Sequence, residues 1–376
     1  MKKRLIFTLI ILLIAAVAVL GTLFLGGELS LRGARRAVNA IAGNSIDAVY
    51  AFEPGLNEVF ADIDGTVVAA GGSGFVAYDK NGAELARAGF SMKTPAIAAK
   101  GDTAAVFDLG GHAVRIVYAD GTVAELPVAN EIISVSVGLG GGFAVCTSGD
   151  GEYKGKAAFY KMRSGTPALI YEWFSGEGYI LGAAVSKDGK RFAVNTLNSN
   201  GGRVILLDSG STAVSAEFLY SLGVILEITF DKSGTLIART ADGVLFITGD
   251  GTTVSSATFN FAAGEPNGYS AGDGFIAAHF AGTQSSAGEL VTADIKGREL
   301  GRIQTSRRLV SLTASGNRIA ALWSDGLDIF DRNLRLIASY PDASGSNFAV
   351  PRGGEAAVVM NGRAGHAFAK QNNIEG

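Results

Sequence analysis

Beyond residue 45 the chain is a succession of short apolar segments, four to seven residues long, separated by Gly, Asp, Asn and Ser. Helical periodicity is absent here, and short apolar runs bounded by turn residues are typical of β-strands. One kind of run, rich in small and β-branched residues, follows a turn and recurs every 37 to 49 residues. Its copies are Thr66–Ala70, Thr103–Phe107, Phe143–Thr147, Phe192–Thr196, Leu236–Thr240, Phe275–Phe280, Ile319–Trp323 and Ala356–Met360. This period corresponds to four strands with their turns, so each unit is predicted to be a propeller blade.

The units share one internal order. An apolar strand such as Ile132–Val137 or Ile180–Val185 precedes the recurring run, and a third and a fourth strand follow it. The third strand ends in a hairpin such as Tyr78–Gly82, where Asp, Asn and Gly suit a tight turn. Eight units fit into residues 46–370, so we predict an all-β, eight-bladed β-propeller there. Seven blades are the alternative, and residues 371–376 form a tail.

The two ends of the repeat region complement each other. The last unit has the runs Phe348–Val350, Ala356–Met360 and His366–Ala369, and it lacks a fourth strand. Ile46–Phe52 is a lone strand before the first unit. We predict that this strand completes the last blade, because a closed ring leaves no open sheet edge there.

The N-terminus carries a candidate membrane anchor. Met1-Lys2-Lys3-Arg4 precedes 21 uncharged residues, Leu5–Leu25, which as a helix would span roughly 30 Å of hydrocarbon. We expect an uncleaved signal anchor at 5–25 with residues 1–4 in the cytoplasm. Ala16-Val17-Ala18 leaves a cleaved signal peptide as the alternative. A stalk at 26–45 would then lead to an extracytoplasmic propeller on a single-pass protein of the cell membrane.

Charge separates the N-terminal part from the rest of the chain. Residues 1–36 hold six Lys and Arg and one Glu, which leaves 26 basic and 34 acidic residues in 37–376. An acidic globular part lacks the electrostatic footprint of nucleic-acid binding. The bilayer, contacted through residues 5–25, is the one partner that the sequence indicates directly.

A turn between the first and second strands carries a family resemblance. Ser186-Lys187-Asp188-Gly189-Lys190-Arg191-Phe192-Ala193 resembles the S-x-D-G-K-R-φ-A segment of TolB-like and WD40-like propellers, and Phe230–Ile237 is a looser copy. The chain lacks the Trp-Asp dipeptide and the Gly-His start of WD40 repeats. As a whole it is similar to membrane-anchored bacterial propeller proteins of unassigned function.

Catalytic and metal-binding signals are weak. The three histidines His112, His279 and His366 fall in different units, where a ring would hold them apart. Cys146 lies in an apolar strand and suits a core position. Asp62-Ile63-Asp64-Gly65 resembles part of a calcium loop but lacks the later ligands, so we interpret it as a turn. We therefore expect no catalytic residue, no metal and no cofactor.

Loop length gives the candidate binding residues. Three loops after the second strand are expected to be long, at Ser148–Lys156, Leu197–Arg203 and Ala281–Glu289, and they share a face with the connections Trp173–Tyr179 and Ala263–Gly272. Exposed aromatic residues on loops of a rigid scaffold suit a contact surface. The candidates are Tyr153, Lys154, Trp173, Tyr179, Asn198 and Tyr269. The alternative is that Trp173 and Tyr179 fill gaps between blades.

Two functions follow from this fold. The first is a non-catalytic, membrane-tethered platform that binds an envelope protein or a glycan. The alternative is a propeller-type hydrolase or lyase that acts on an envelope glycan or peptide at the channel mouth. Convergence of several ionisable side chains at that mouth would favour the enzyme, since fold alone does not settle function.

Overall fold

The computed structural model describes residues 44–51, 58–211, 213–249, 254–262, 264–282, 287–353, 356–361 and 364–370. The expected cytoplasmic end 1–4, the anchor 5–25, nearly all of the stalk 26–45 and the tail 371–376 lie outside these residues. Within the part that is described, no helix is both long and apolar enough to cross a membrane. Residues Asp47–Ala367 form one compact unit.

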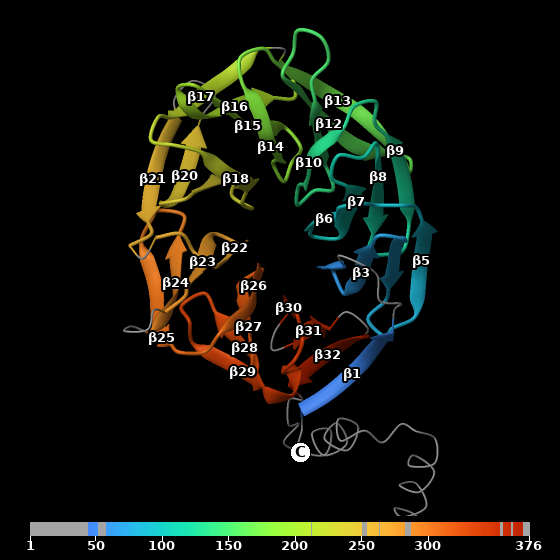
Figure 1. Cartoon of the computed structure of the whole chain (residues 1–376), viewed down its shortest axis with the longest axis vertical. Helices are drawn as coiled ribbons and strands as arrows, with labels where there is room; N and C mark the ends of the chain where they lie inside the picture. The colour runs from blue at the N-terminus through green and yellow to red at the C-terminus, as the bar shows by residue number, and fades with distance from the viewer. Residues whose placement is uncertain are drawn as a thin grey trace, which may run out of the picture. The chain divides into compact units, whose positions relative to one another are not determined.

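The described strands form eight four-stranded antiparallel sheets around a central channel (Figure 1), so the predicted eight-bladed propeller is confirmed. Blades 1 and 2 hold β2 (Val59–Ile63), β3 (Thr66–Gly71), β4 (Gly74–Tyr78), β5 (Glu84–Gly89), β6 (Pro95–Lys100), β7 (Thr103–Asp108), β8 (Ala113–Tyr118) and β9 (Val123–Pro127). Blades 3 and 4 hold β10 (Ile132–Val137), β11 (Phe143–Ser148), β12 (Gly155–Arg163), β13 (Thr166–Ser175), β14 (Tyr179–Val185), β15 (Arg191–Asn198), β16 (Gly201–Asp208) and β17 (Val214–Tyr220).

Blades 5 and 6 hold β18 (Ile225–Phe230), β19 (Leu236–Thr240), β20 (Gly243–Gly249), β21 (Val254–Asn260), β22 (Gly268–Gly272), β23 (Phe275–Phe280), β24 (Gly288–Asp294) and β25 (Glu299–Thr305). Blade 7 holds β26 (Leu309–Ser315), β27 (Arg318–Trp323), β28 (Gly326–Asp331) and β29 (Leu336–Tyr340), followed by the short 3₁₀ turn Pro341–Ala343. Blade 8 holds β30 (Phe348–Arg352), β31 (Ala356–Met360), β32 (Ala364–Lys370) and β1 (Asn44–Ala51).

Burial follows the place of each strand in its blade. The second strands β3 and β23 are buried at every position, whereas the fourth strands β5 and β25 alternate between exposed and half-buried residues. A second strand has a neighbouring blade against each face of its sheet, so both sets of its side chains must be apolar or small. The outermost strand faces solvent on its free edge. This explains why the recurring apolar run was the clearest sequence signal.

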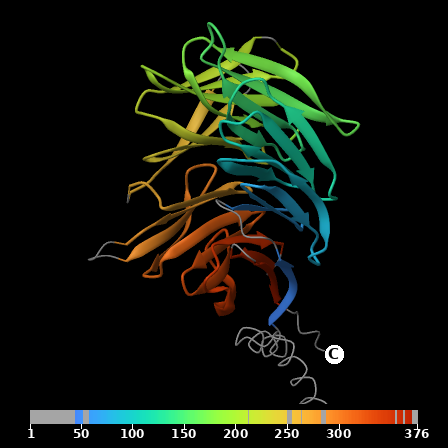
Figure 2. The ribbon, with the colours of Figure 1, turned by 45° about the vertical axis from the view of Figure 1, so that its right-hand side comes forward.

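The hydrophobic core lies between the blades, whose twist is visible in Figure 2. One cluster joins blades 3 and 4 and contains Phe159 and Phe192, whose rings stack at 4.3 Å between centroids. Other clusters join blades 1 and 2, 2 and 3, 4 and 5, 5 and 6, and 6 and 7 in the same way. Each blade therefore buries its apolar surface against the next blade and has no core of its own.

Polar side chains add ties between neighbouring blades. In the family-like turn, the Asp188 carboxylate accepts from Ser186 Oγ (2.7 Å), and Gly189 has a φ of +66°. Arg191, the last polar residue of that turn, donates to the Gly234 carbonyl of blade 5 at 3.2 Å. The motif thus shapes a hairpin and also fastens its blade to the following one.

The ring closes as the sequence predicts. Blade 8 has the strand order β1-β32-β31-β30, so the N-terminal strand supplies the outermost strand of the C-terminal blade. Tyr50 of β1 and Tyr78 of β4 pack together with Val358 and Met360 in a cluster that joins blades 8 and 1. The closure therefore includes a hydrophobic core as well as a sheet edge.

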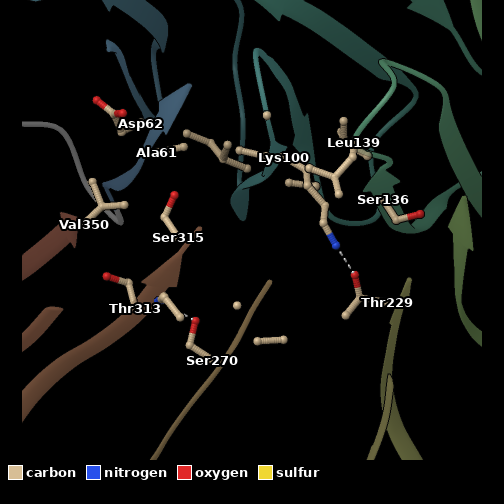
Figure 3. Close-up of a pocket in the computed structure, with 18 of the residues that line it drawn as sticks. Ala61, Asp62, Lys100, Ser136, Leu139, Thr229, Ser270, Thr313, Ser315 and Val350 are labelled. Carbon is tan, nitrogen blue, oxygen red and sulfur yellow. Dashed lines mark hydrogen bonds between the residues drawn. The ribbon is translucent and has the colours of Figure 1, made fainter. Parts of the chain in front are cut away.

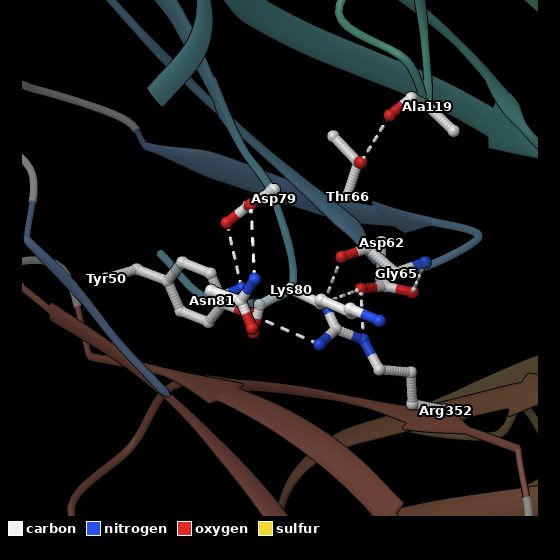
Figure 4. Close-up of polar contacts among 9 residues, drawn as sticks. All are labelled: Tyr50, Asp62, Gly65, Thr66, Asp79, Lys80, Asn81, Ala119 and Arg352. Atoms are coloured by element: carbon white, nitrogen blue, oxygen red, sulfur yellow. Dashed lines mark hydrogen bonds and ion pairs between the residues drawn. The ribbon is translucent and has the colours of Figure 1, made fainter. Parts of the chain in front are cut away.

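A polar cluster reinforces this junction (Figure 4). Arg352 of blade 8 donates from Nε to Asp62 Oδ2 of blade 1 at 2.8 Å, from Nη1 to the Tyr50 hydroxyl at 3.1 Å and from Nη2 to the Gly65 carbonyl at 2.8 Å. The Tyr78 hydroxyl donates to the Ala51 carbonyl at 2.6 Å. Burial raises the pKa of the Asp62 carboxyl, and the Arg352 guanidinium opposes that rise. Residues from the two ends of the propeller sequence thereby meet at one buried ion pair.

His279 is the buried histidine of blade 6. Its ring lies edge-on to Trp323, with 5.5 Å between ring centroids, and Nδ1 lies 2.6 Å from Asn267 Oδ1. Nε2 is buried without a hydrogen-bond partner. Desolvation lowers the pKa of His279, so the folded protein holds this imidazole in its neutral form.

The closure cluster predicts a large effect for Arg352→Met. Removal of the guanidinium leaves the buried Asp62 carboxylate without its partner, so the free energy of unfolding should fall by about 3 kcal/mol in urea titrations. Arg87→Met is the matched control, because its ion pair with Glu84 is exposed and should contribute less than about 1 kcal/mol. Equal losses in the two variants would contradict the structural role given to Arg352.

His279 predicts a loss of stability in mild acid. The unfolded chain binds a proton near pH 6.5 and the folded chain does so only at lower pH, so stability falls as the pH drops below 6.5. His279→Gln should cost about 1–2 kcal/mol at pH 7.5 and flatten the dependence of the unfolding midpoint on pH between 7.5 and 5. His112→Gln, in an exposed bend before β8, should leave the slope unchanged. A His279→Gln slope identical to that of the unmodified chain would refute this account.

Candidate functional site

The antiparallel order of each blade defines two faces of the propeller. Hairpins between second and third strands share one face, here called the loop face, with the connections between blades. Hairpins between first and second strands lie on the opposite side, here called the turn face. The loop face carries an exposed aromatic cluster, and the channel opens on the turn face.

The hairpin between β11 and β12 presents the first part of the cluster. It covers residues 149–154, as the long loop predicted from the sequence requires. Gly149 is needed here because a Cβ atom would lie 1.9 Å from the Tyr153 carbonyl oxygen. The Lys154 amide donates to the Ser175 carbonyl at 2.7 Å, which fastens the hairpin to the end of β13. The neighbouring side chains of Tyr153 and Lys154 are thereby held at a fixed position.

Three aromatic rings lie together on this face. The Tyr153 ring is 5.0 Å from that of Phe174 between centroids, and Lys154 Nζ lies 5.6 Å above the ring of Tyr179. Tyr153, Phe174 and Tyr179 are 49%, 44% and 63% exposed. We call Tyr153, Lys154, Phe174 and Tyr179 the aromatic cluster.

The connection that carries Tyr179 is also fixed by hydrogen bonding. Ser175 Oγ donates to the Gly178 carbonyl at 2.6 Å within the segment that leads from β13 to β14. Gly178 runs close to the Leu197 carbonyl, where a Cβ atom would meet it at 3.1 Å. The aromatic cluster therefore belongs to two neighbouring blades whose backbones are tied together.

Trp173, a candidate binding residue from the sequence, is half-buried, and its neighbour Phe174, which was not a candidate, is exposed. β13 continues to Ser175, so side chains alternate between its two faces up to that point. Trp173 is half-buried against the core of blades 3 and 4, as the gap-filling alternative states, and Phe174 faces solvent. Trp173 pairs with Ala157 and faces the core, so the next side chain along the strand, Phe174, must face solvent. The sequence alone could have shown this only if the end of β13 had been known.

Asn198 lies on the loop face but not in a long loop. β15 and β16 pair as far as Asn198 and Gly201, so the expected loop Leu197–Arg203 is wrong and a two-residue turn stands there. Asn198 Oδ1 accepts from the Asn200 amide at 2.8 Å and shapes that turn. The third expected loop, Ala281–Glu289, includes residues 283–286, which lie outside the described part of the chain.

Tyr269 lies in the channel, so its expected place in the connection Ala263–Gly272 is wrong. It is the second residue of β22, the innermost strand of blade 6, and the Arg239 guanidinium lies 5.3 Å above its ring. Burial raises the pKa of the Tyr269 hydroxyl. The small residues around it, Gly268 and Ser270, gave no strand signal in the sequence.

The channel is a cavity of about 970 Å³ lined by the first strands of all eight blades. Toward the loop face its wall is apolar, with Phe60, Leu181, Leu226 and Phe348, which we call the apolar collar. Toward the turn face the wall carries hydroxyl and charged groups (Figure 3), including Asp62, Lys100, Ser136, Thr229, Ser270 and Ser315. The channel is therefore apolar at one end and polar at the other.

Ionisable groups do gather along the polar end, and three of the carboxylates there form ion pairs. Arg352 neutralises Asp62, and Lys232 lies 3.3 Å from Asp273 Oδ2. Arg239 Nε lies 3.5 Å from a Glu227 carboxylate oxygen. Each of these three carboxylates therefore faces a cation rather than open space in the channel.

Lys100 departs from this pattern. Its side chain extends from β6 of blade 2 to β18 of blade 5, where Nζ donates to Thr229 Oγ1 and to the Phe230 carbonyl, both at 2.7 Å (Figure 3). Burial lowers the pKa of the Lys100 ammonium. Within the described residues its hydrogen bonds go to neutral oxygens only.

The cysteine and the histidines do not form a catalytic or metal-binding site in the described part of the chain. Burial raises the pKa of the Cys146 thiol to about 12, which keeps it protonated and unreactive. His112, His279 and His366 fall in blades 2, 6 and 8. Within the described residues, no group of three His, Cys, Asp or Glu side chains is placed to hold a metal ion.

Solved structures share the propeller fold at low sequence identity. Saccharomyces cerevisiae Sqt1 has a TM-score of 0.60 and 11% identity over 87% of this chain and 100% of that one. The C-terminal WD40 domain of Sif2 has a TM-score of 0.57 and 15% identity over 86% and 99% of the two chains. BamB from Moraxella catarrhalis has a TM-score of 0.52 and 12% identity over 89% and 99%. These likenesses show the fold alone.

Sequence comparison gives the family. No curated protein matches the chain. The model of a family of unknown function, DUF5711, matches residues 45–341, which is most of the chain and nearly all of the propeller. The chain therefore belongs to the DUF5711 family, and its fold is a β-propeller.

Proposed function

We propose that this chain is a non-catalytic, membrane-tethered platform that binds a protein partner of the cell envelope through the aromatic cluster on its loop face. The observation that carries the proposal is the exposure of Tyr153, Phe174 and Tyr179 on a rigid scaffold. Aromatic residues dominate the energetic centres of protein interfaces because they bury a large area at low entropic cost.

The cluster has the preorganisation that such an interface needs. Its hairpin is fastened to Ser175 and its connection is fixed by the Ser175–Gly178 hydrogen bond. A partner that covers the rings would therefore lose little conformational entropy in this chain on binding. Lys154 above Tyr179, with Glu152 and Glu177 exposed nearby in sequence, supplies a polar rim.

The membrane tether rests on the sequence. Leu5–Leu25 has the length and composition of a spanning helix, and the cations at residues 2–4 favour a cytoplasmic N-terminus. With that orientation the propeller lies outside the cytoplasmic membrane. The partner would then be an envelope protein, and a wall glycan is the other ligand to test.

The alternative of a hydrolase or lyase draws support from the ionisable residues at the channel mouth. Three of the carboxylates there, those of Asp62, Glu227 and Asp273, each have a cationic partner, and Asp64 and Asp102 also line the mouth. A glycosidase or lyase needs carboxyl groups that are free to exchange protons with the substrate. The pairing therefore favours the binding platform.

Photo-crosslinking tests the platform directly. The full chain should capture a protein from solubilised membranes when a photoreactive residue replaces the exposed Glu152 beside the cluster. With the same photoreactive residue at 152, the triple variant Tyr153→Ala, Phe174→Ala, Tyr179→Ala should lower recovery of that protein about tenfold or more. Leu169→Ala is the control, because Leu169 is 52% exposed on the same strand as Phe174 but distant from the aromatic cluster.

Two results would count against the proposal. Unchanged recovery with the triple variant would exclude the aromatic cluster as the interface. Sedimentation of the full chain with purified cell-wall glycan, lost in the same variant, would assign the cluster to a glycan.

The tether has its own test. The full chain should stay with the membrane pellet during alkaline extraction, because a spanning helix is held by the hydrocarbon core and not by surface charge. A chain that begins after residue 25 should appear in the supernatant. Release of the full chain by alkali would contradict the anchor, and a shortened mature N-terminus would indicate the cleaved signal peptide.

A further inference from the structure

The unusual feature of the channel is a lysine without an acidic hydrogen-bond partner. Lys100 Nζ spends two of its three N–H groups on Thr229 Oγ1 and the Phe230 carbonyl. The third N–H remains for a group inside the cavity. Thr229 accepts from Lys100, so its own hydroxyl hydrogen is also available. Two donors therefore stand side by side at the polar end of the channel.

The acidic residues near Lys100 already have other partners. Asp273 pairs with Lys232 and Glu227 with Arg239. Asp231 Oδ1 accepts from the amides of Ser233 and Thr235, at 2.8 and 2.9 Å, in the turn that follows β18, while its Oδ2 is buried without a hydrogen-bond partner. The Lys100 ammonium is partly desolvated and hydrogen-bonds to no carboxylate, so an anion that binds to it directly would stabilise its charge.

The rest of the cavity restricts the kind of anion. The apolar collar lies beyond the polar end, and its Leu226 exposes 40% of its surface to the channel. Apolar surface next to a single ammonium suits a ligand with one charge and an apolar body. Asp64 and Asp102 also line the mouth, and they would repel a dianion such as phosphate more than a monoanion.

We propose that the polar end of the channel binds a small organic monocarboxylate, which accepts hydrogen bonds from Lys100 Nζ and Thr229 Oγ1 and directs its apolar part toward the collar. This site lies on the opposite side of the propeller from the aromatic cluster. It does not depend on the partner-binding function, and the two can fail separately.

The site is tested by measuring the binding of butyrate to the full chain, with saturation-transfer NMR and with calorimetry. Butyrate should bind saturably, and butyramide, its neutral isostere, should not compete. Lys100→Met should weaken butyrate binding about tenfold or more, since it removes a charge-assisted hydrogen bond. Thr229→Val should weaken it less. Affinity should also fall as the pH rises through the pKa of Lys100, because the neutral amine holds an anion poorly.

Lys187→Met is the matched control. Lys187 is exposed on the turn face in blade 4 and does not line the channel. Its variant should bind butyrate like the unmodified chain, and the thermal unfolding of all variants should show that each is folded. Absence of butyrate binding, equal binding by Lys100→Met, or competition by butyramide would overturn the proposal. Preferential binding of inorganic phosphate would overturn the assignment to a monocarboxylate.

Discussion

Burial of each blade on both of its faces is the constraint on which the rest of the structure depends. The second strands β3 and β23 are buried at every position, and the hydrophobic clusters lie between blades. No blade can bury its apolar surface without two neighbours. The first and last blades must therefore meet, and the chain satisfies this requirement with β1, Tyr50 and the Arg352–Asp62 pair. Closure of the ring therefore completes the hydrophobic core between the first and last blades.

This constraint also explains where function can reside. Side chains between blades are committed to packing, so the surfaces that remain for binding are the loop face, the turn face, the channel and the exposed side of the fourth strands. On the loop face, one hairpin and one connection present three exposed rings. In the channel, the inward side chains of the first strands create an apolar collar and a polar mouth. Both arrangements rest on backbone that the ring holds in place.

The sequence predicted the fold well because two-sided burial leaves a periodic signal. Continuous apolar runs at a regular spacing identified the second strands, and the missing fourth strand of the last unit identified Ile46–Phe52 as its completion. The site was predicted less completely. The C-terminal part of β15 is rich in polar residues up to Asn198, and small residues surround Tyr269 in β22, so neither position resembled a strand.

Contacts across the ring were beyond sequence reasoning. The sequence indicates Trp173 rather than Phe174 as the exposed ring. Which of these two neighbours faces solvent depends on where β13 ends, and no sequence signal marks that end. Lys100 Nζ reaches Thr229 Oγ1 only because the first strands of blades 2 and 5 line the same channel. Such a pair, 129 residues apart, has no local pattern. Periodicity reports what each strand packs against, whereas the lining of the channel depends on how eight strands are brought together.

Native-state hydrogen exchange of the β1 amides, residues 44–51, tests the closed ring most directly. If β1 is an integral strand of blade 8, those amides that bond to β32 should exchange as slowly as the amides of β31 and β32, through one shared opening reaction. Exchange of β1 at the rate of an unstructured chain, with the other blades still protected, would show that the N-terminal strand does not close the propeller.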